Sequence, residues 1–243
     1  MPATTTGEFL GTLLLVLLGD GVVANVLLDG SKGKDAGWLA ITAGWAFAVL
    51  AGVEVATALG APGELNPAVT LANVLLGTRT GGDAIAHVAA QLAGAVVGAT
   101  LVWLAYLPHW RLTHDAARIR GVFCTAPAVR SPAANVATEA IATAVLVIVA
   151  GALGTRGVAG PTPATNLGPA LVGALVWGLG LSLGGPTGYA LNPARDLGPR
   201  LAHALLPIAN KSHSDWPYAW VPIVGPCLGA ILAAIVWGAV RPA

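Results

Sequence analysis

The chain has 243 residues, of which 56% are hydrophobic and only 9% are charged, and its mean hydropathy is +0.75. Soluble domains carry roughly 25% charged residues, so this composition excludes an ordinary soluble domain and predicts a chain that lies mostly in lipid. The net charge of +1 gives no sign of binding to nucleic acid. The two cysteines, Cys124 and Cys227, form neither a disulfide framework nor a metal-binding pattern.

Six apolar runs approach the length of about 20 mostly apolar residues that a bilayer-spanning helix needs. They are residues 7–28, 38–59, 85–107, 135–153, 167–183 and 221–240. We expect the first run to be retained rather than cleaved as a signal peptide, because the preceding MPATTTGEF has no basic residue. The pattern predicts an all-α membrane protein with six transmembrane helices.

Two further apolar segments, 67–76 and 193–206, are about half the length of a span. Each begins with the tripeptide Asn-Pro-Ala. The two tripeptides are Asn66, Pro67 and Ala68, and Asn192, Pro193 and Ala194. Asn at the N-cap accepts hydrogen bonds from the first free backbone N–H groups of a helix, and Pro at the first helical position gives up no hydrogen bond. Each tripeptide therefore predicts the start of a re-entrant half-helix.

The two halves of the chain are similar in sequence. Glu8 in the first apolar run matches Glu139 in the fourth, 131 residues later, and the segment LAGAVVGA matches IVGPCLGA at the same offset. The chain divides into a first repeat at 1–107, a connecting loop at 108–134 and a second repeat at 135–243. Because three spans is an odd number, the second repeat must enter the membrane inverted. Inverted repeats with broken helices place a site near the bilayer midplane.

Irregular backbone at membrane depth is tolerated only where it is buried in protein or lines a water-filled cavity. We therefore expect the half-helices to meet end to end, with Asn66 and Asn192 together and two positive helix ends converging there. Their amide hydrogens are the expected donors to a passing molecule, and backbone carbonyls of GAPGE and GPTGYA are the expected acceptors. We interpret Glu8 and Glu139 as scaffold carboxylates that accept hydrogen bonds from loop N–H groups, since carboxylates inside a membrane are otherwise costly.

Two Asn-Pro-Ala boxes in inverted halves, each with a Glu-bearing first span, closely resemble the major intrinsic proteins, the family of aquaporins and glycerol facilitators. The resemblance covers nearly the whole chain and implies a passive channel that needs no cofactor. It also implies a homotetramer with one pore per subunit, a location in the plasma membrane and cytoplasmic termini. The positive charges of the loops favour the opposite orientation. We expect cytoplasmic termini because the match to the family's motifs is more specific than the charge count.

The resemblance assigns a selectivity filter on the outer side of the two boxes. Its four positions are Trp45, Gly180, Tyr189 and Arg195. Water-selective members typically have His at the position of Gly180, whereas glycerol facilitators have Gly there and two aromatic residues beside it. Asp196, directly after Arg195, and Pro222 in the sixth span are further similarities to the glycerol type.

The chemistry of these side chains agrees with the resemblance. A polyol has a hydrocarbon edge and a hydroxyl edge, so aromatic faces suit its CH groups while a guanidinium donates to its oxygens. A fixed Arg195 helps to repel cations and protons. We predict passive movement of glycerol and water. Dihydroxyacetone, urea, hydrogen peroxide and undissociated small acids also fit a wide filter.

Three acidic residues are not explained by the resemblance. Glu64 stands near the inner mouth, where the family often has His. Asp20 and Glu54 lie within the first and second spans. Glu54 is nine residues after Trp45, about 180° around a helix, so we expect it to face away from the pore. The loop before the first box is also one residue longer than in the glycerol type.

The leading alternative is a secondary transporter of a small polar solute, because broken helices at a midplane site also build transporters. The ionisable coupling residues that a transporter needs are not evident in the inferred lane, with Asp20 and Glu54 as reservations. A membrane enzyme is a third interpretation, but no nucleophile–base or metal spacing is present, and the five histidines show no ligand spacing. We therefore predict no catalytic residues, no metal and no cofactor.

Overall fold

The computed structural model describes residues 2–154 and 167–241, and every regular element in these ranges is a helix. The connection expected between the fourth and fifth spans lies almost wholly outside the described residues. Five helices are long and apolar enough to cross a membrane. They are α1 (Ala3–Leu27), α2 (Gly37–Ala58), α4 (Gly81–Ala105), α7 (Pro132–Leu153) and α10 (Val221–Val240). A sixth apolar helix, α8 (Gly168–Leu183), has 16 residues. The predicted all-α membrane fold is confirmed.

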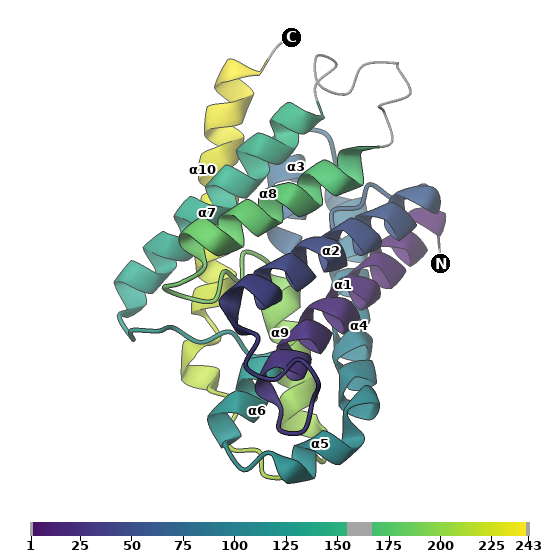
Figure 1. Cartoon of the computed structure of the whole chain (residues 1–243). Coiled ribbons are helices and arrows are strands. Elements are labelled where there is room, and N and C mark those ends of the chain that lie inside the picture. The colour runs from purple at the N-terminus through teal and green to yellow at the C-terminus, as the bar shows by residue number, and fades with distance from the viewer. Residues whose placement is uncertain (1, 155–166, 242–243) are drawn as a thin grey trace.

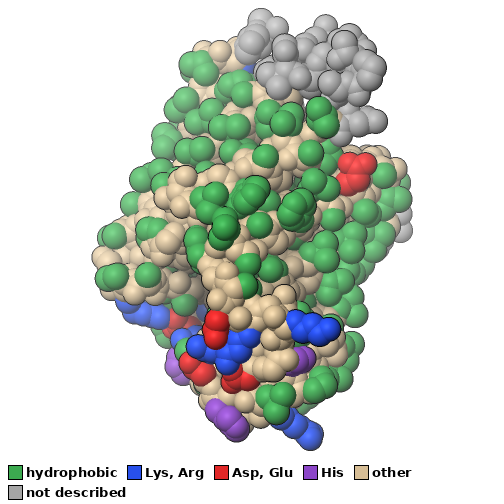
Figure 2. Space-filling view, viewed as in Figure 1, with side chains coloured by type: hydrophobic (Ala, Val, Ile, Leu, Met, Phe, Trp, Pro, Cys, Tyr) green, Lys and Arg blue, Asp and Glu red, His purple; other side chains and the backbone are tan. Residues whose placement is uncertain are grey.

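The surface agrees with a membrane-embedded molecule. Charged and histidine side chains gather at one end of the visible face, and most side chains over the rest of that face are hydrophobic (Figure 2). The N-terminal end of α1 and the C-terminal end of α10 both lie away from the charged end (Figure 1). Many apolar side chains are exposed along the helices. Their exposure would be unfavourable in water and is favourable in the hydrocarbon core of a bilayer.

The two half-helices begin where the tripeptides predict. Helix α3 (Pro67–Leu75) follows Asn66, whose side-chain oxygen accepts from the Ala68 N–H at 2.9 Å. Helix α9 (Pro193–Leu205) follows Asn192 in the same way, with a bond of 2.9 Å from the Ala194 N–H. Both helices end one residue before the predicted boundary. The N-cap asparagines satisfy backbone donors that would otherwise be orphaned in a low-dielectric interior.

The half-helices join the two repeats. Helix α1 packs against α2 and α4, and α7 packs against α8 and α10, so each repeat has its own three-helix group. Helix α3 of the first repeat packs mainly against α10, and α9 of the second repeat packs mainly against α4 (Figure 1). Contact between α2 and α8 closes the remaining side. Each half-helix therefore lies against the other repeat, and the start of each faces the middle of the molecule.

Glycine pairs let the helices of each repeat approach closely. A Cβ on Gly94 or Gly98 of α4 would lie only 2.3 or 2.5 Å from backbone oxygens of α1. A Cβ on Gly229 of α10 would lie 2.3 Å from the Ala140 oxygen of α7, and one on Gly225 would lie 2.5 Å from the Glu139 Cβ. Small residues at such crossings are the usual basis of close helix packing in membranes. The same device is thus used at equivalent positions of both repeats.

The connecting segment contains more structure than the loop that we expected from its polarity. It includes α5 (Leu107–Leu112) and α6 (Ala116–Phe123). The side chain of Asp115 accepts from two N–H groups at the start of α6, and Ile119 and Phe123 are completely buried. Helix α6 packs against α1 and α9. A short 3-10 turn, η2 (Trp216–Tyr218), precedes α10. Helix α6 covers part of the half-helix α9.

Candidate conducting pore

The asparagines of the two boxes are tied to each other's loops. Asn66 Nδ2 donates to the Leu191 carbonyl at 2.9 Å, and Asn192 Nδ2 donates to the Leu65 carbonyl at 2.7 Å. Each NH₂ group has two hydrogens, so this bond uses one and leaves one for a solute. The reciprocal bonds make each box part of the other's support.

The residues before the boxes have unusual backbone conformations. Leu65 has φ of +51° and Leu191 has φ of +53°, and Tyr189 has φ of +39°. Non-glycine residues in this region are strained by about 1–3 kcal/mol each. The same strained conformation occurs at Leu65 and Leu191, which are equivalent in the two repeats, so it is a shared feature of the two pore loops. In this conformation the Leu65 and Leu191 carbonyls point at the opposite asparagine.

Two buried carboxylates hold these strained segments. Glu8 accepts from the Glu64 and Leu65 N–H groups at 2.8 and 2.7 Å. In the second repeat, Glu139 accepts from the Ala190 and Leu191 N–H groups at 3.0 and 2.8 Å. Both side chains are fully buried or nearly so. The contacts have the form that we expected of scaffold carboxylates, and they convert free loop donors into satisfied ones.

A cavity of about 330 Å³ runs past the asparagine pair. Both asparagines line it, together with Trp45, Tyr189 and Arg195. Apolar side chains from both repeats form much of its wall. They include Val49, Val53, Leu146, Val147, Val172 and Val176. Glu64 and Asn73 line it at the end formed by the loop before α3. The cavity therefore has one polar lane on a largely apolar wall.

Arg195 lines this cavity and lies against an aromatic face. Its guanidinium carbon is 3.9 Å from the centre of the Trp45 ring, a stacking distance at which a cation is attracted to an indole. Neither the indole N–H of Trp45 nor the hydroxyl of Tyr189 has a hydrogen-bond partner in the described part of the chain. Both groups are buried, and other parts of the two side chains line the cavity.

Gly180 acts on the cavity through Tyr189. It is not among the described residues that line the cavity. A Cβ on Gly180 would lie 2.9 Å from the Tyr189 ring and 2.9 Å from the Thr42 methyl group. The Gly180 carbonyl accepts from the indole N–H of Trp38 at 3.0 Å, and the Trp38 and Tyr189 rings meet edge to face at 5.6 Å. The space that glycine leaves is therefore filled by the Tyr189 ring.

Comparison with known families identifies the architecture. A family model described as major intrinsic protein matches residues 3–237.

The chain belongs to the major intrinsic protein family.

Similar proteins carry transport names. A protein of Thermotoga maritima named a probable glycerol uptake facilitator is 52% identical over 230 residues, which cover 95% of this chain and 96% of that protein. A D/L-lactic acid transporter of Lactiplantibacillus plantarum is 40% identical over 231 residues, covering 93% of each. The X-ray structure of the aquaglyceroporin from Plasmodium falciparum superposes with a TM-score of 0.85 at 29% identity, covering 98% of this chain and 96% of that one.

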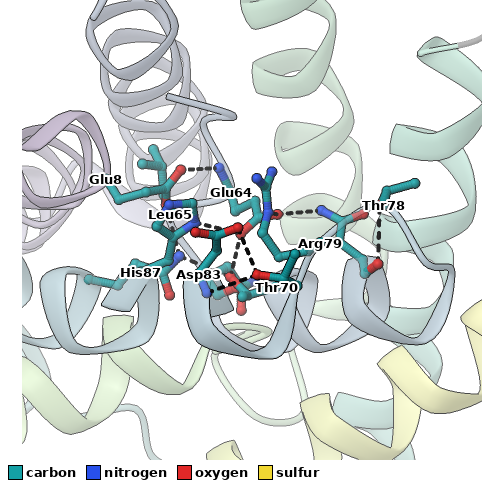
Figure 3. Close-up of polar contacts among 12 residues, drawn as sticks. Glu8, Glu64, Leu65, Thr70, Thr78, Arg79, Asp83 and His87 are labelled. Atoms are coloured by element: carbon teal, nitrogen blue, oxygen red, sulfur yellow. Dashed lines mark hydrogen bonds and ion pairs between the residues drawn. The ribbon is translucent and has the colours of Figure 1, made fainter. Parts of the chain in front are cut away.

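In this major intrinsic protein Glu64 forms the centre of a polar cluster at one end of the pore (Figure 3). Its carboxylate accepts from the Thr70 hydroxyl at 2.7 Å and the Asn73 amide at 2.6 Å. The Arg79 Nε donates to it at 3.2 Å, and His87 Nδ1 lies 3.5 Å away. Glu64 therefore ties the pore loop to α3, to the turn after α3 and to α4. Sequence reasoning placed it near the mouth but did not find these partners.

Glu8, Glu64 and His87 could each offer a ligand atom, and these atoms lie within 4.8 Å of one another. The carboxylate oxygens already accept from backbone and side-chain donors, with Gln91 Nε2 adding a bond to Glu8 at 2.8 Å. A metal site would leave those donors unpaired. The arrangement is that of a hydrogen-bond network.

Asp196 and Pro222, the two further similarities to glycerol facilitators, occupy structural positions. Asp196 accepts from the Thr125 N–H and hydroxyl at 2.9 and 2.6 Å, and from Arg200 Nε at 2.7 Å. Arg200 also donates to backbone carbonyls of the segment before η2. Asp196 thus joins the connecting segment to α9. Pro222 lies in the first turn of α10, where proline disrupts no helical bond.

Sequence reasoning missed two contacts in this region and left one acidic residue without a role. It did not find the Arg200 pair with Asp196, although four residues is the helical spacing for such a pair. It used Trp38 only as the start of a span, and no sequence signal linked it to Tyr189. It left Asp20 unexplained. Glu54 is exposed on α2, on a side away from the cavity lining, as its spacing from Trp45 predicts.

Proposed function

We propose that this protein is a passive channel for glycerol, water and other small uncharged solutes. The observation that carries the proposal is a cavity shared by both box asparagines and the Trp45–Tyr189–Arg195 group, in a chain that is 52% identical to a probable glycerol uptake facilitator. A polar lane on an apolar wall suits a molecule with hydroxyls along one edge and CH groups along the other. No catalytic step is part of this function.

Each group of pore residues has a different proposed role. Asn66 and Asn192 each offer one amide hydrogen at the centre, where two helix N-termini add positive potential. Trp45 and Tyr189 offer apolar ring surfaces to the CH groups of a solute. Arg195 supplies guanidinium donors and a positive charge that opposes cations and protons. Gly180 sets the position of the Tyr189 ring. We propose these residues as the pore centre and the filter.

A wider solute range follows from the same surfaces. Dihydroxyacetone, urea, hydrogen peroxide and undissociated small acids have the size and polarity that the proposed filter accepts. Undissociated lactic acid is a specific second candidate, because a relative with 40% identity is named a D/L-lactic acid transporter. An acid passes as the neutral molecule, since the largely apolar wall gives a carboxylate too few partners to replace its hydration shell.

The assembly and location are also proposals. Four copies form a homotetramer with one pore each, the tetramer lies in the plasma membrane, and both termini face the cytoplasm. Exposed apolar side chains along the helices support burial in lipid or against a second copy. The resemblance to the family is the ground for choosing four copies.

Stopped-flow light scattering on proteoliposomes tests the function. We expect glycerol efflux well above that of empty liposomes, proportional to the gradient and unchanged when proton and sodium gradients are abolished. Glycerol flux that saturates at millimolar concentration and depends on an ion gradient would instead establish the secondary transporter. A panel of the solutes named above, run on the same vesicles, ranks them.

A further inference from the structure

Asp20 has a buried carboxylate that accepts no hydrogen bond within the described part of the chain. It lies in α1 between Gly19 and Gly21, and its relative exposure is 0%. Neither carboxylate oxygen has a hydrogen-bond donor among residues 2–154 and 167–241. Glu8 on the same helix is equally buried but accepts from the loop N–H groups. Acidic groups within a membrane mark functional positions unless a partner explains them.

The nearest cation to Asp20 is the proposed filter arginine. Asp20 Oδ1 lies 3.7 Å from Arg195 Nη1. The other acidic group near the start of α9, Asp196, is already paired with Arg200 at 2.7 Å. Within the described residues Asp20 is thus the carboxylate that faces Arg195. Opposite charges attract each other at this distance, although it exceeds that of a direct hydrogen bond.

The wall around the pair is shaped to hold the guanidinium. Gly19 has no side chain, and a Cβ there would lie 2.2 Å from the Trp45 ring, so the indole packs directly on α1. The same indole receives the Arg195 guanidinium on its face at 3.9 Å. Gly19, Asp20 and Trp45 therefore make one surface, with an aromatic face and an anionic edge, against which Arg195 lies. The Arg195 residue is only 8% exposed.

We propose that Asp20 is a positioning residue of the filter and the counter-ion of Arg195. Its charge draws the guanidinium onto the Trp45 face and keeps it out of the lumen, so that the passage stays wide enough for a polyol. Its charge also balances part of the positive charge in the filter. The inference rests on the proposed filter, and it assigns a purpose to an acidic residue that contributes no hydrogen bond to the fold.

Asp20→Asn tests the positioning role. The amide has nearly the same shape but no charge, so Arg195 is released toward the lumen. We expect the ratio of glycerol to water flux to fall by about tenfold, the scale of losing a charged partner. Glu54→Gln is the matched control, because it removes a carboxylate from an exposed position on α2, away from the cavity lining. An unchanged flux ratio in Asp20→Asn would overturn the proposal.

Cation leak tests the counter-ion role by a property that a merely structural residue would not alter. Arg195→Val leaves the Asp20 carboxylate facing the filter, and we expect a measurable leak of potassium in a vesicle flux assay. Asp20→Asn/Arg195→Val removes both charges, and we expect a leak several-fold smaller. The double variant holds no unpaired buried charge, so it remains informative even where Asp20→Asn alone inserts poorly. Equal leak in the single and double variants would overturn the proposal.

The same variants distinguish a failure of the proposed filter from a failure of the counter-ion role of Asp20. Arg195→Val without effect on leak or flux ratio would remove both the filter and the counter-ion role. An effect in Arg195→Val, with no effect of Asp20→Asn in either background, would remove the counter-ion role alone. A flux ratio that falls in Asp20→Asn but not in the Arg195→Val background supports Asp20 acting through Arg195, since independent residues give additive changes.

Discussion

At the scale of single residues, a buried carboxylate is stabilised by what donates to it. Glu8 and Glu139 lie in apolar helices yet satisfy two loop N–H groups each. Those bonds hold Leu65 and Leu191 in left-handed backbone conformations that aim their carbonyls across the molecule. The hydrogen bonds to these carboxylates therefore offset the backbone strain of the pore loops.

Removing one of these carboxylates should loosen its loop. Glu139→Ala leaves the Ala190 and Leu191 donors buried and unpaired, at about 1–3 kcal/mol for each donor. We expect a lower thermal unfolding temperature in detergent and a lower glycerol flux per inserted protein. Glu139→Gln keeps one acceptor oxygen and should lie between Glu139→Ala and the parent. Parental stability and flux in Glu139→Ala would refute the scaffold role.

Gly180 controls the filter through its neighbour. A methyl group in Gly180→Ala meets the Tyr189 ring and Thr42 at 2.9 Å, so the ring must shift. We expect glycerol flux to fall several-fold more than water flux, because the shifted Tyr189 ring narrows the passage and glycerol is the larger solute. Gly178→Ala on the same helix is the control, since a Cβ there has nothing described within 4 Å. Both solutes falling in equal proportion would mean that Gly180 only packs the helix.

At the scale of elements, the close crossing of α1 and α4 depends on glycine. A Cβ on Gly94 would lie 2.3 Å from the Phe9 carbonyl oxygen, a backbone atom that cannot turn aside. The helices must separate to admit it. Since Glu8 and the pore loop move with α1, a change in this crossing reaches the pore.

Gly94→Ala should therefore destabilise the fold by about 1–3 kcal/mol, as overpacking of a close interface does. Unfolding in a denaturing detergent titration measures the change. Gly81→Ala, in the first turn of the same helix, has nothing described within 4 Å of its Cβ and should leave stability within about 0.5 kcal/mol of the parent. Similar stability in the two variants would show that α1 and α4 need no glycine at their crossing.

At the scale of the whole molecule, each half-helix packs on the other repeat and each box asparagine binds the other repeat's loop. One repeat by itself lacks the bond that the other repeat's asparagine donates to its pore loop. The two halves must therefore fold together. The apolar outer faces of the finished monomer remain free for lipid and for other copies.

The proposed homotetramer gives a direct mass prediction. Native mass spectrometry of the detergent-solubilised protein should show a species of four times the 24.2 kDa chain mass. Flux per chain should be independent of the fraction assembled, because each subunit is proposed to hold its own pore. A predominant monomer or dimer across mild detergents would contradict the tetramer.

The number and kind of elements were predictable from the sequence. Apolar length predicted the spanning helices, and Asn followed by Pro predicted both half-helix starts to the residue, because capping and proline geometry are local effects. The repeat of Glu8 at Glu139 and the paired glycines predicted which elements are equivalent. The short helices α5 and α6 were missed, since their order comes from burial of Ile119 and Phe123 against distant helices and not from their own polar composition.

The site was only partly predictable, for the same reason. The sequence by itself determined which polar residues belong to the pore, because their spacing from the two Asn-Pro-Ala boxes is fixed within one helix or one turn. Only the tertiary structure decided which side chains meet: Asp20 with Arg195, Gly180 with Tyr189, and each asparagine with the loop of the other repeat. These contacts join residues far apart in sequence, and their geometry depends on how closely whole helices approach one another.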